Sequence, residues 1–164
     1  MVESTGVDEA LSPIIGKYLE AQRNKLLQEG NWQQITLTRQ WAKQAPNEAG
    51  VYVIKEGDNL IYVGETGNLR GRMGDLLDSR NHCVRRTLGE RLFNVRDGFH
   101  KATASLKFPL DIETLLNTHI SNHLSIAYLT VPLGRKELEE LIDKELDVRF
   151  RLNKRGKRKG KIKD

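Results

Sequence analysis

The strongest constraint on this chain is a pair of short strand-like runs separated by a turn. The string GVY (residues 50–52) begins the first run, and the string YVG (residues 62–64) ends the second. Both runs are rich in β-branched residues, and the link between them, KEGDN (residues 55–59), has the glycine and Asp-Asn chemistry of a hairpin turn. The pattern therefore predicts a β-hairpin of residues 50–55 and 60–64, with one tyrosine on each strand.

The sequence around this hairpin predicts helices on both sides of it and one further strand. Helical spacing of apolar residues and capping signals such as Asn68 define the helices, and β-branched alternation defines the strand. We expect helices over residues 9–29, 69–77, 84–93, 111–120 (capped by Asp111) and 135–148, an exposed loop over 94–110, and a strand over 126–131. These elements give three parts: a helical extension (1–45), an α/β domain (46–153) and a basic tail (154–164).

Composition narrows the class of protein. The chain has 164 residues, about one domain, with 38% hydrophobic and 30% charged residues and no apolar run near the roughly 18 residues that cross a bilayer. The amino terminus is acidic where a secretory signal is basic, and the single cysteine, Cys83, excludes an intramolecular disulfide or a cysteine-based zinc cluster. We expect a cytoplasmic protein without a membrane segment.

The net charge of +5 is concentrated at the carboxyl end. From Arg149 onward there are nine Lys or Arg and one acid, whereas the preceding residues hold 18 basic and 21 acidic side chains. A cationic segment without apolar anchors is expected to be disordered and to bind phosphates with release of counterions. We therefore expect a nucleic-acid partner, DNA in the first place, although a merely solubilising tail is the alternative. The expected contacts with nucleic acid are Asn153, Lys154, Arg155, Lys157, Arg158 and Lys159.

Hydrolysis of a phosphodiester requires a group that activates water and a cation that holds the phosphoryl oxygens. Arg72 suits the second task, because a guanidinium stays charged and grips two phosphate oxygens at once. Tyr52 and Tyr62 are candidates for activating or positioning water, with a pKa lowered by Arg72 and a metal ion. Gly64, next to the second tyrosine, is expected to leave the backbone open to a ligand. Each residue alone is typical of packing, and only the joint pattern indicates an active site.

A divalent metal ion requires a carboxylate that faces the sheet. In the acidic segment RKELEELIDKEL, helical periodicity places Glu139 beside the apolar stripe and Glu140 nearly opposite to it. Glu139 is therefore the expected ligand of Mg²⁺ or Mn²⁺, with Glu140 as the alternative and Glu145 also open. The pair His119 and His123 has the spacing of a zinc site but lacks the intervening glutamate of the HExxH motif, so we interpret it as structural.

Residues 46–153 resemble the GIY-YIG nuclease family. The resemblance rests on GVY, on YVG, on the Asn-Leu-Arg stretch that leads to Arg72, and on Glu139 and Asn153. The resemblance implies a small α/β (α+β) fold, with a three-stranded antiparallel sheet flanked by helices, and a metal-dependent endonuclease. It implies that Tyr52 is the general base or its relay and that Tyr62 orients the water. Arg72 would bind the scissile phosphate, and Glu139 the metal ion. Several relatives place a histidine near the phosphate, which makes His82 a further candidate that could accept a proton from Tyr52 or water.

Two positions depart from the family pattern. Leu76 stands where many members have His or Tyr, and Glu65 stands where excision-repair relatives have lysine. These departures favour an alternative function, a GIY-YIG-like module that binds nucleic acid with weak or no turnover. If the chain is a nuclease, the two phenols, Arg72 and the carboxylate are expected to converge on a pocket wide enough for a sugar-phosphate strand.

Overall fold

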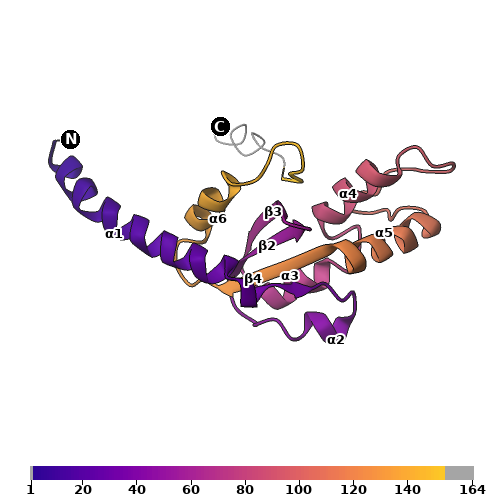
Figure 1. Ribbon diagram of the computed structural model, residues 1–164, viewed down its shortest axis with the longest axis horizontal. Helices are drawn as coiled ribbons and strands as arrows, with labels where there is room; N and C mark the ends of the chain where they lie inside the picture. Colours follow the sequence, from indigo (N-terminus) through magenta and orange to yellow (C-terminus); the bar gives the residue numbers. More distant parts are fainter. Residues whose placement is uncertain (1, 154–164) are drawn as a thin grey trace.

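The computed structural model describes residues 2–153 and has a four-stranded antiparallel sheet at its centre, with strand order β1-β4-β2-β3 (Figure 1). Along the chain the elements are α1 (Val2–Leu27), the 3-10 turn η1 (Glu29–Asn31), β1 (Gln33–Gln34), α2 (Arg39–Ala42), β2 (Gly50–Glu56), β3 (Asn59–Thr66), α3 (Leu69–Asp75), α4 (Cys83–Phe93), α5 (Leu110–His123), β4 (Leu124–Thr130) and α6 (Arg135–Asp143). The predicted α+β class, with an antiparallel sheet flanked by helices, is confirmed.

The predicted hairpin is confirmed as β2 and β3, which are joined by a turn with Gly57 in the left-handed region at φ 58°. The two strands pair from Gly50↔Thr66 to Ile54↔Tyr62, and the register then shifts so that Lys55 pairs with Leu60. Ile61 is left without a partner, so β3 carries a bulge directly before Tyr62. Strand β2 lies between β4 and β3, which explains why its first five residues are all buried.

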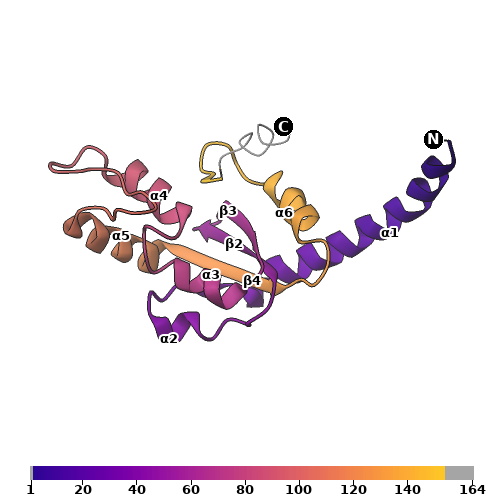
Figure 2. The same cartoon turned by 180° about the vertical axis from the view of Figure 1, so that it is seen from behind.

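The sheet has two faces with separate cores. Tyr52 and Ile54 of β2 point to one face, where α2, α3, α4 and α5 pack, and Val51 and Val53 point to the other face, where α1 and α6 pack. This arrangement follows from the two-residue period of a strand. In Figure 1, α1 projects from one end of the molecule and the α4–α5 pair lies at the other end, and Figure 2 shows the same arrangement from behind.

Helices α3 and α6 end earlier than predicted, at Asp75 and Asp143, for a common reason. The amides after the last residue of α3 bond three residues back, with Leu76 N to Met73 O at 3.2 Å, and Leu146 N bonds Asp143 O at 3.2 Å after α6. Such tight final turns end the α-helical pattern while the apolar side chains stay inside, so periodicity alone overestimates the length. The expected cap Asp111 is wrong: the helix begins at Leu110 after Pro109, and Asp111 lies in its first turn.

Three further expectations need correction. A fourth strand, β1, pairs with β4, although the sequence predicted three strands. The amino-terminal helix begins at Val2, before the predicted residue 9. The segment between α4 and α5 is not wholly exposed, because Phe108 is buried and packs so closely on Gly89 that a Cβ there would lie 2.5 Å from its ring. Within residues 2–153 no helix has the length and apolarity that a bilayer crossing requires, and the predicted basic tail (154–164) lies outside the described residues.

Candidate active site

The centre of the candidate site is the phenol oxygen of Tyr52. Tyr52 lies in the middle of β2, and its side chain is fully buried on the helix-rich face of the sheet. Its oxygen lies 2.8 Å from Nε2 of His82 and accepts a hydrogen bond of 3.0 Å from Nε of Arg72. The hairpin supplies the phenol, and α3 and the start of α4 supply its two partners.

Tyr62 stands beside Tyr52 on the neighbouring strand. The ring centroids of the two tyrosines are 5.8 Å apart, and that of Tyr62 is 5.6 Å from that of His82. The hydroxyl of Tyr62 accepts a hydrogen bond of 3.6 Å from Sγ of Cys83, the residue that follows His82. The structure therefore brings together all four predicted catalytic residues, Tyr52, Tyr62, Arg72 and His82.

Arg72 lies in α3, and the cap at the start of this helix positions it. The Asn68 side chain caps this helix by accepting the amide of Gly71 at 3.0 Å, as predicted, which fixes the direction in which α3 leaves the sheet. Nη1 of Arg72 donates to Asp75 at 3.0 Å and to the carbonyl of Asn81 at 3.2 Å. The Arg72 side chain is 26% exposed, so part of it is accessible from solution.

His82 is the residue before α4 and caps that helix. Its Nδ1 accepts the backbone amide of Val84 at 3.1 Å, and its side chain is completely buried, whereas a loop histidine is usually exposed. Burial lowers the pKa of His82 well below 6.5, and the positive charges of Arg72, Arg86 and Arg85 lower it further. The imidazole is therefore neutral at neutral pH.

The pKa values of the two phenols are raised, whereas the sequence predicts a lowering. Burial raises the pKa of Tyr52 from 10.0 to about 12, because it outweighs the lowering by Arg72 and by the hydrogen bonds of Tyr62 and Arg72. Burial also raises the pKa of Tyr62, and the adjacent Tyr52 and Cys83 add to the rise. Arg72 lowers the pKa of Tyr52 as predicted, but the net shift is upward, because the sequence does not show how completely the rings are enclosed.

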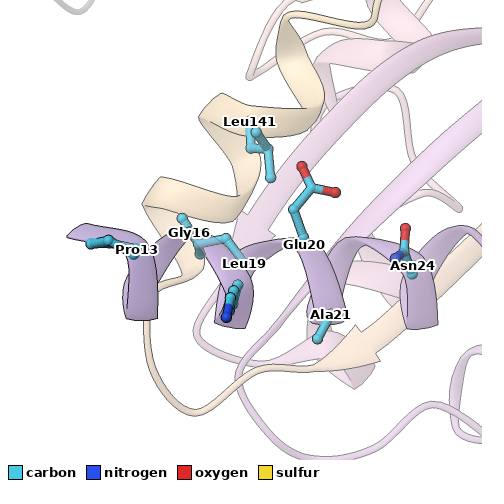
Figure 3. Close-up of a pocket in the computed structure, with 8 residues that line it drawn as sticks. Pro13, Gly16, Leu19, Glu20, Ala21, Asn24 and Leu141 are labelled. Atoms are coloured by element: carbon cyan, nitrogen blue, oxygen red, sulfur yellow. The ribbon is translucent and has the colours of Figure 1, made fainter. Parts of the chain in front are cut away.

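The space beside Gly64 is filled by the protein. A Cβ at Gly64 would lie 2.6 Å from Cζ and 2.7 Å from the hydroxyl of Tyr52, so the ring of the first tyrosine covers the backbone that was expected to be open. Tyr62 is 7% exposed and Tyr52 fully buried. The expected wide pocket is therefore replaced by a packed cluster in which Arg72 is the member that meets solvent. A hollow between α1 and α6, lined by residues such as Leu19, Glu20 and Leu141, lies elsewhere (Figure 3).

The three candidate carboxylates of the last helical segment differ in their surroundings. Glu139 is 7% exposed, Glu140 is exposed, and Glu145 forms an ion pair with Arg23 of α1. Glu139 is thus the enclosed acid that the periodicity predicted. However, the neighbouring Leu138 and Ile142 pack with Val51 and Val53, so α6 covers the face of the sheet opposite to that of α3 and α4.

The donor set suits one kind of metal ion. Residues 2–153 hold no group of three or more His, Cys, Asp or Glu side chains that could form an all-protein cage. Mg²⁺ keeps several waters and takes one or two carboxylates together with substrate phosphates, so an enclosed single carboxylate such as that of Glu139 fits it. A zinc site, which needs three or four protein ligands, does not fit these residues.

The remaining predicted residues lie at the edge of the sheet or outside the described chain. The Asn153 side chain accepts the amide of Val63 at 3.0 Å and donates to its carbonyl at 2.8 Å, so it connects the segment after α6 to β3. Lys154, Arg155, Lys157, Arg158 and Lys159 lie beyond the described residues. Of the two departures from the family, Glu65 pairs with Arg135 at 3.2 Å and Leu76 is buried in the core of the tyrosine face.

Residues 48–123 match the family model of the GIY-YIG catalytic domain. No curated protein matches the chain. Among solved structures, the chain is similar to the magnesium-bound GIY-YIG N-terminal endonuclease domain of UvrC from Thermotoga maritima, with 17% identity, a TM-score of 0.37, and 71% of this chain and 94% of that chain covered. A tyrosine-to-phenylalanine mutant and an asparagine-to-alanine mutant of that domain, each bound to its catalytic divalent cation, both give 19% identity and a TM-score of 0.36 at the same coverage. The predicted resemblance to the GIY-YIG family is therefore confirmed over residues 48–123.

Proposed function

We propose that this protein is a metal-dependent endonuclease that hydrolyses phosphodiester bonds in DNA. The observation that carries the proposal is the Tyr52 oxygen, which lies within 3.0 Å of Nε of Arg72 and 2.8 Å of Nε2 of His82. A phenol that shares hydrogen bonds with a guanidinium and an imidazole in a dry environment is costly to bury, and such arrangements concentrate at catalytic sites.

In this proposal Arg72 binds the scissile phosphate. It is charged at every working pH, and its partly exposed guanidinium faces solvent while Nε stays on Tyr52. A phosphate that approaches the cluster meets Arg72 first, and the Tyr52 oxygen lies directly behind it. Arg72 then stabilises the charge that develops on the phosphoryl oxygens, Tyr52 activates the attacking water, and Tyr62 orients it.

Glu139 is the proposed ligand of a divalent cation, Mg²⁺ or Mn²⁺. When bound, the ion would supply Lewis-acid chemistry to phosphate oxygens that reach this carboxylate, which α6 holds on the sheet face opposite to the tyrosine cluster. The contribution of the chain is a carboxylate that is 7% exposed and held on α6 by the packing of Leu138 and Ile142.

DNA is the proposed substrate because the chain offers positive charge to a polyanion. The Arg72 side chain is partly exposed, and its charge lies close enough to His82 to lower the pKa of that imidazole. The carboxyl-terminal segment adds seven Lys or Arg after Asn153. Such charge raises both the affinity for a polyanion and its rate of association.

A second candidate function is a nucleic-acid-binding module without turnover. The observation in its favour is the complete burial of Tyr52, whose raised pKa of about 12 keeps the phenol neutral at neutral pH. In this candidate the tyrosine cluster is a core element, and Arg72 with the basic segment only binds phosphates.

Incubation of the full chain with supercoiled plasmid separates the two candidates. The nuclease proposal predicts conversion to nicked circles with Mg²⁺ or Mn²⁺ and none with EDTA. A chain that shifts DNA in a gel but never nicks it under any of these conditions supports the binding module and overturns the nuclease.

The metal ligand is tested by binding of Mn²⁺ to the protein, followed by electron paramagnetic resonance. Glu139→Gln should abolish the bound signal, and the matched Glu140→Gln variant, one position away on the exposed side, should retain it. Equal affinity of the two variants for Mn²⁺ would exclude Glu139 as the ligand, whatever the activity of the protein.

A further inference from the structure

The two ring nitrogens of His82 have different partners, and one of those partners fixes the tautomer. The backbone amide of Val84, which can only donate, points at Nδ1 from 3.1 Å. Nδ1 must therefore present a lone pair. Because a neutral imidazole carries one proton, that proton lies on Nε2.

Nε2 of His82 is the atom that faces Tyr52, at 2.8 Å from the phenol oxygen. With its proton on Nε2, the imidazole donates a hydrogen bond to Tyr52. A charged imidazole is disfavoured, because it would place a second N–H against the amide of Val84 and a positive charge beside Arg72, Arg85 and Arg86. The ring is also completely enclosed.

A second donor converges on the same oxygen. Nε–H of Arg72 lies 3.0 Å from the Tyr52 oxygen, and a guanidinium has no lone pair to offer. The phenol oxygen of Tyr52 thus accepts from two fixed donors, and neither can take its proton. Two donors aimed at one oxygen are the arrangement that stabilises a negative charge on it.

We propose that His82 is a positioning residue that, together with Arg72, forms a two-donor cradle for the oxygen of Tyr52 and stabilises its phenolate. This inference rests on the proposed function, in which Tyr52 activates water, and it reverses the role expected for His82 as a proton acceptor. Tyr52 first loses its phenolic proton to solvent, the phenolate then takes a proton from the attacking water, and His82 keeps the proton on Nε2 throughout.

The tautomer can be measured without any activity. Two-bond ¹H–¹⁵N correlation spectra of the full chain labelled with ¹⁵N-histidine, assigned with a His82→Asn variant, distinguish the two neutral forms. The proposal predicts an Nε2–H ring for His82 across pH 6 to 8. An Nδ1–H ring, or a ring that becomes charged in this range, would overturn the proposal and leave the nuclease question untouched.

Two matched variants separate a donor from a base in the nicking assay. Gln at position 82 can place an N–H near the position of Nε2 but cannot act as a base, and Asn keeps the helix cap but does not reach Tyr52. The proposal predicts that His82→Gln nicks plasmid within about tenfold of the wild-type rate, and that His82→Asn is slower by about 100-fold.

The order of the two variants excludes a purely structural explanation. If His82 acted only by capping α4, the nicking rate would fall more in His82→Gln than in His82→Asn. This is the reverse of the order expected if His82 donates a hydrogen bond to Tyr52. Equal large losses in both variants would mean that His82 acts as a base, and would contradict the proposal.

Discussion

The Tyr52 hydroxyl is hydrogen-bonded to both Arg72 and His82, and its protonation should control the rate. Its pKa is raised to about 12, so at neutral pH the phenolate is a minor form whose fraction rises about tenfold per pH unit. If the phenolate accepts the proton of water, single-turnover nicking should accelerate about tenfold per unit between pH 7 and 9. A rate that is flat over this range, with the protein folded throughout, would contradict a Tyr52 base.

The Tyr52 ring packs directly on Gly64 and leaves no space for a larger residue at this position. In Gly64→Ala the new Cβ would lie 2.6 Å from Cζ of Tyr52, whose oxygen is held by His82 and Arg72, so the ring cannot simply move aside. Overpacking of this kind costs about 1–3 kcal/mol, measurable by urea denaturation.

The matched control for this prediction is Gly74→Ala. Gly74 lies in α3, and a Cβ there meets nothing within 4 Å, so alanine should be neutral or stabilising by roughly 0.5–1 kcal/mol. Equal stability of the two variants would mean that the Tyr52 ring does not depend on Gly64.

At the scale of elements, a buried ion pair joins α4 to α5. Nη2 of Arg85, which is 1% exposed, donates to Glu113 at 2.7 Å, and the same carboxylate binds the hydroxyl of Ser79 at 2.7 Å and the amide of Phe108 at 2.9 Å. Glu113→Ala would leave a buried charge without its partner. We expect a loss of about 3–5 kcal/mol in the free energy of unfolding, measured by chemical denaturation.

The surface pair of Arg96 with Asp111 is the control for this effect. It spans 4.0 Å between side chains that are 50% and 58% exposed, so Asp111→Ala should change the free energy of unfolding by less than about 1 kcal/mol. A loss in Glu113→Ala that is no larger than in Asp111→Ala would show that the buried pair does not hold α4 and α5 together.

The elements that the sequence predicted are those with a strong local signal. The hairpin followed from β-branched runs around a glycine turn, and Asn68 marked the start of α3. Strand β1 could not be predicted, because two glutamines carry no alternation and are a strand only through their pairing with β4. The helix ends were overestimated because tight final turns keep the apolar period.

For the site, local sequence identified the residues but not their environment. The convergence of Tyr52, Tyr62, Arg72 and His82 depends on neighbouring elements, the hairpin and the two helices after it. Their burial, and with it the direction of the pKa shifts, depends on distant elements such as α5 and Leu152. No periodicity reveals which face of the sheet α6 covers, which is why the position of Glu139 relative to the tyrosines was not foreseen.

At the scale of the whole molecule, charge is divided between a slightly acidic body and a basic end. Deletion of residues 154–164 removes seven Lys or Arg and one Asp. Binding to duplex DNA, measured by fluorescence anisotropy over a series of salt concentrations, should weaken, and the salt slope should fall by about 0.9 for each phosphate that this segment neutralises in the full chain. The requirement for a metal ion should stay. An unchanged slope would mean that this segment does not bind DNA.

Hydrolysis of a phosphodiester at Arg72 and the tyrosine cluster is the central proposal for this protein, and the nicking rates of two neighbouring arginine variants test it most directly. Arg72→Ala removes the donor that bonds to Tyr52, whereas Arg70→Ala, in the same helix, removes only a bond to the carbonyl of Ala45. We expect a rate reduced by about 100- to 1000-fold for Arg72→Ala and a near wild-type rate for Arg70→Ala. Wild-type nicking by a folded Arg72→Ala variant would contradict it.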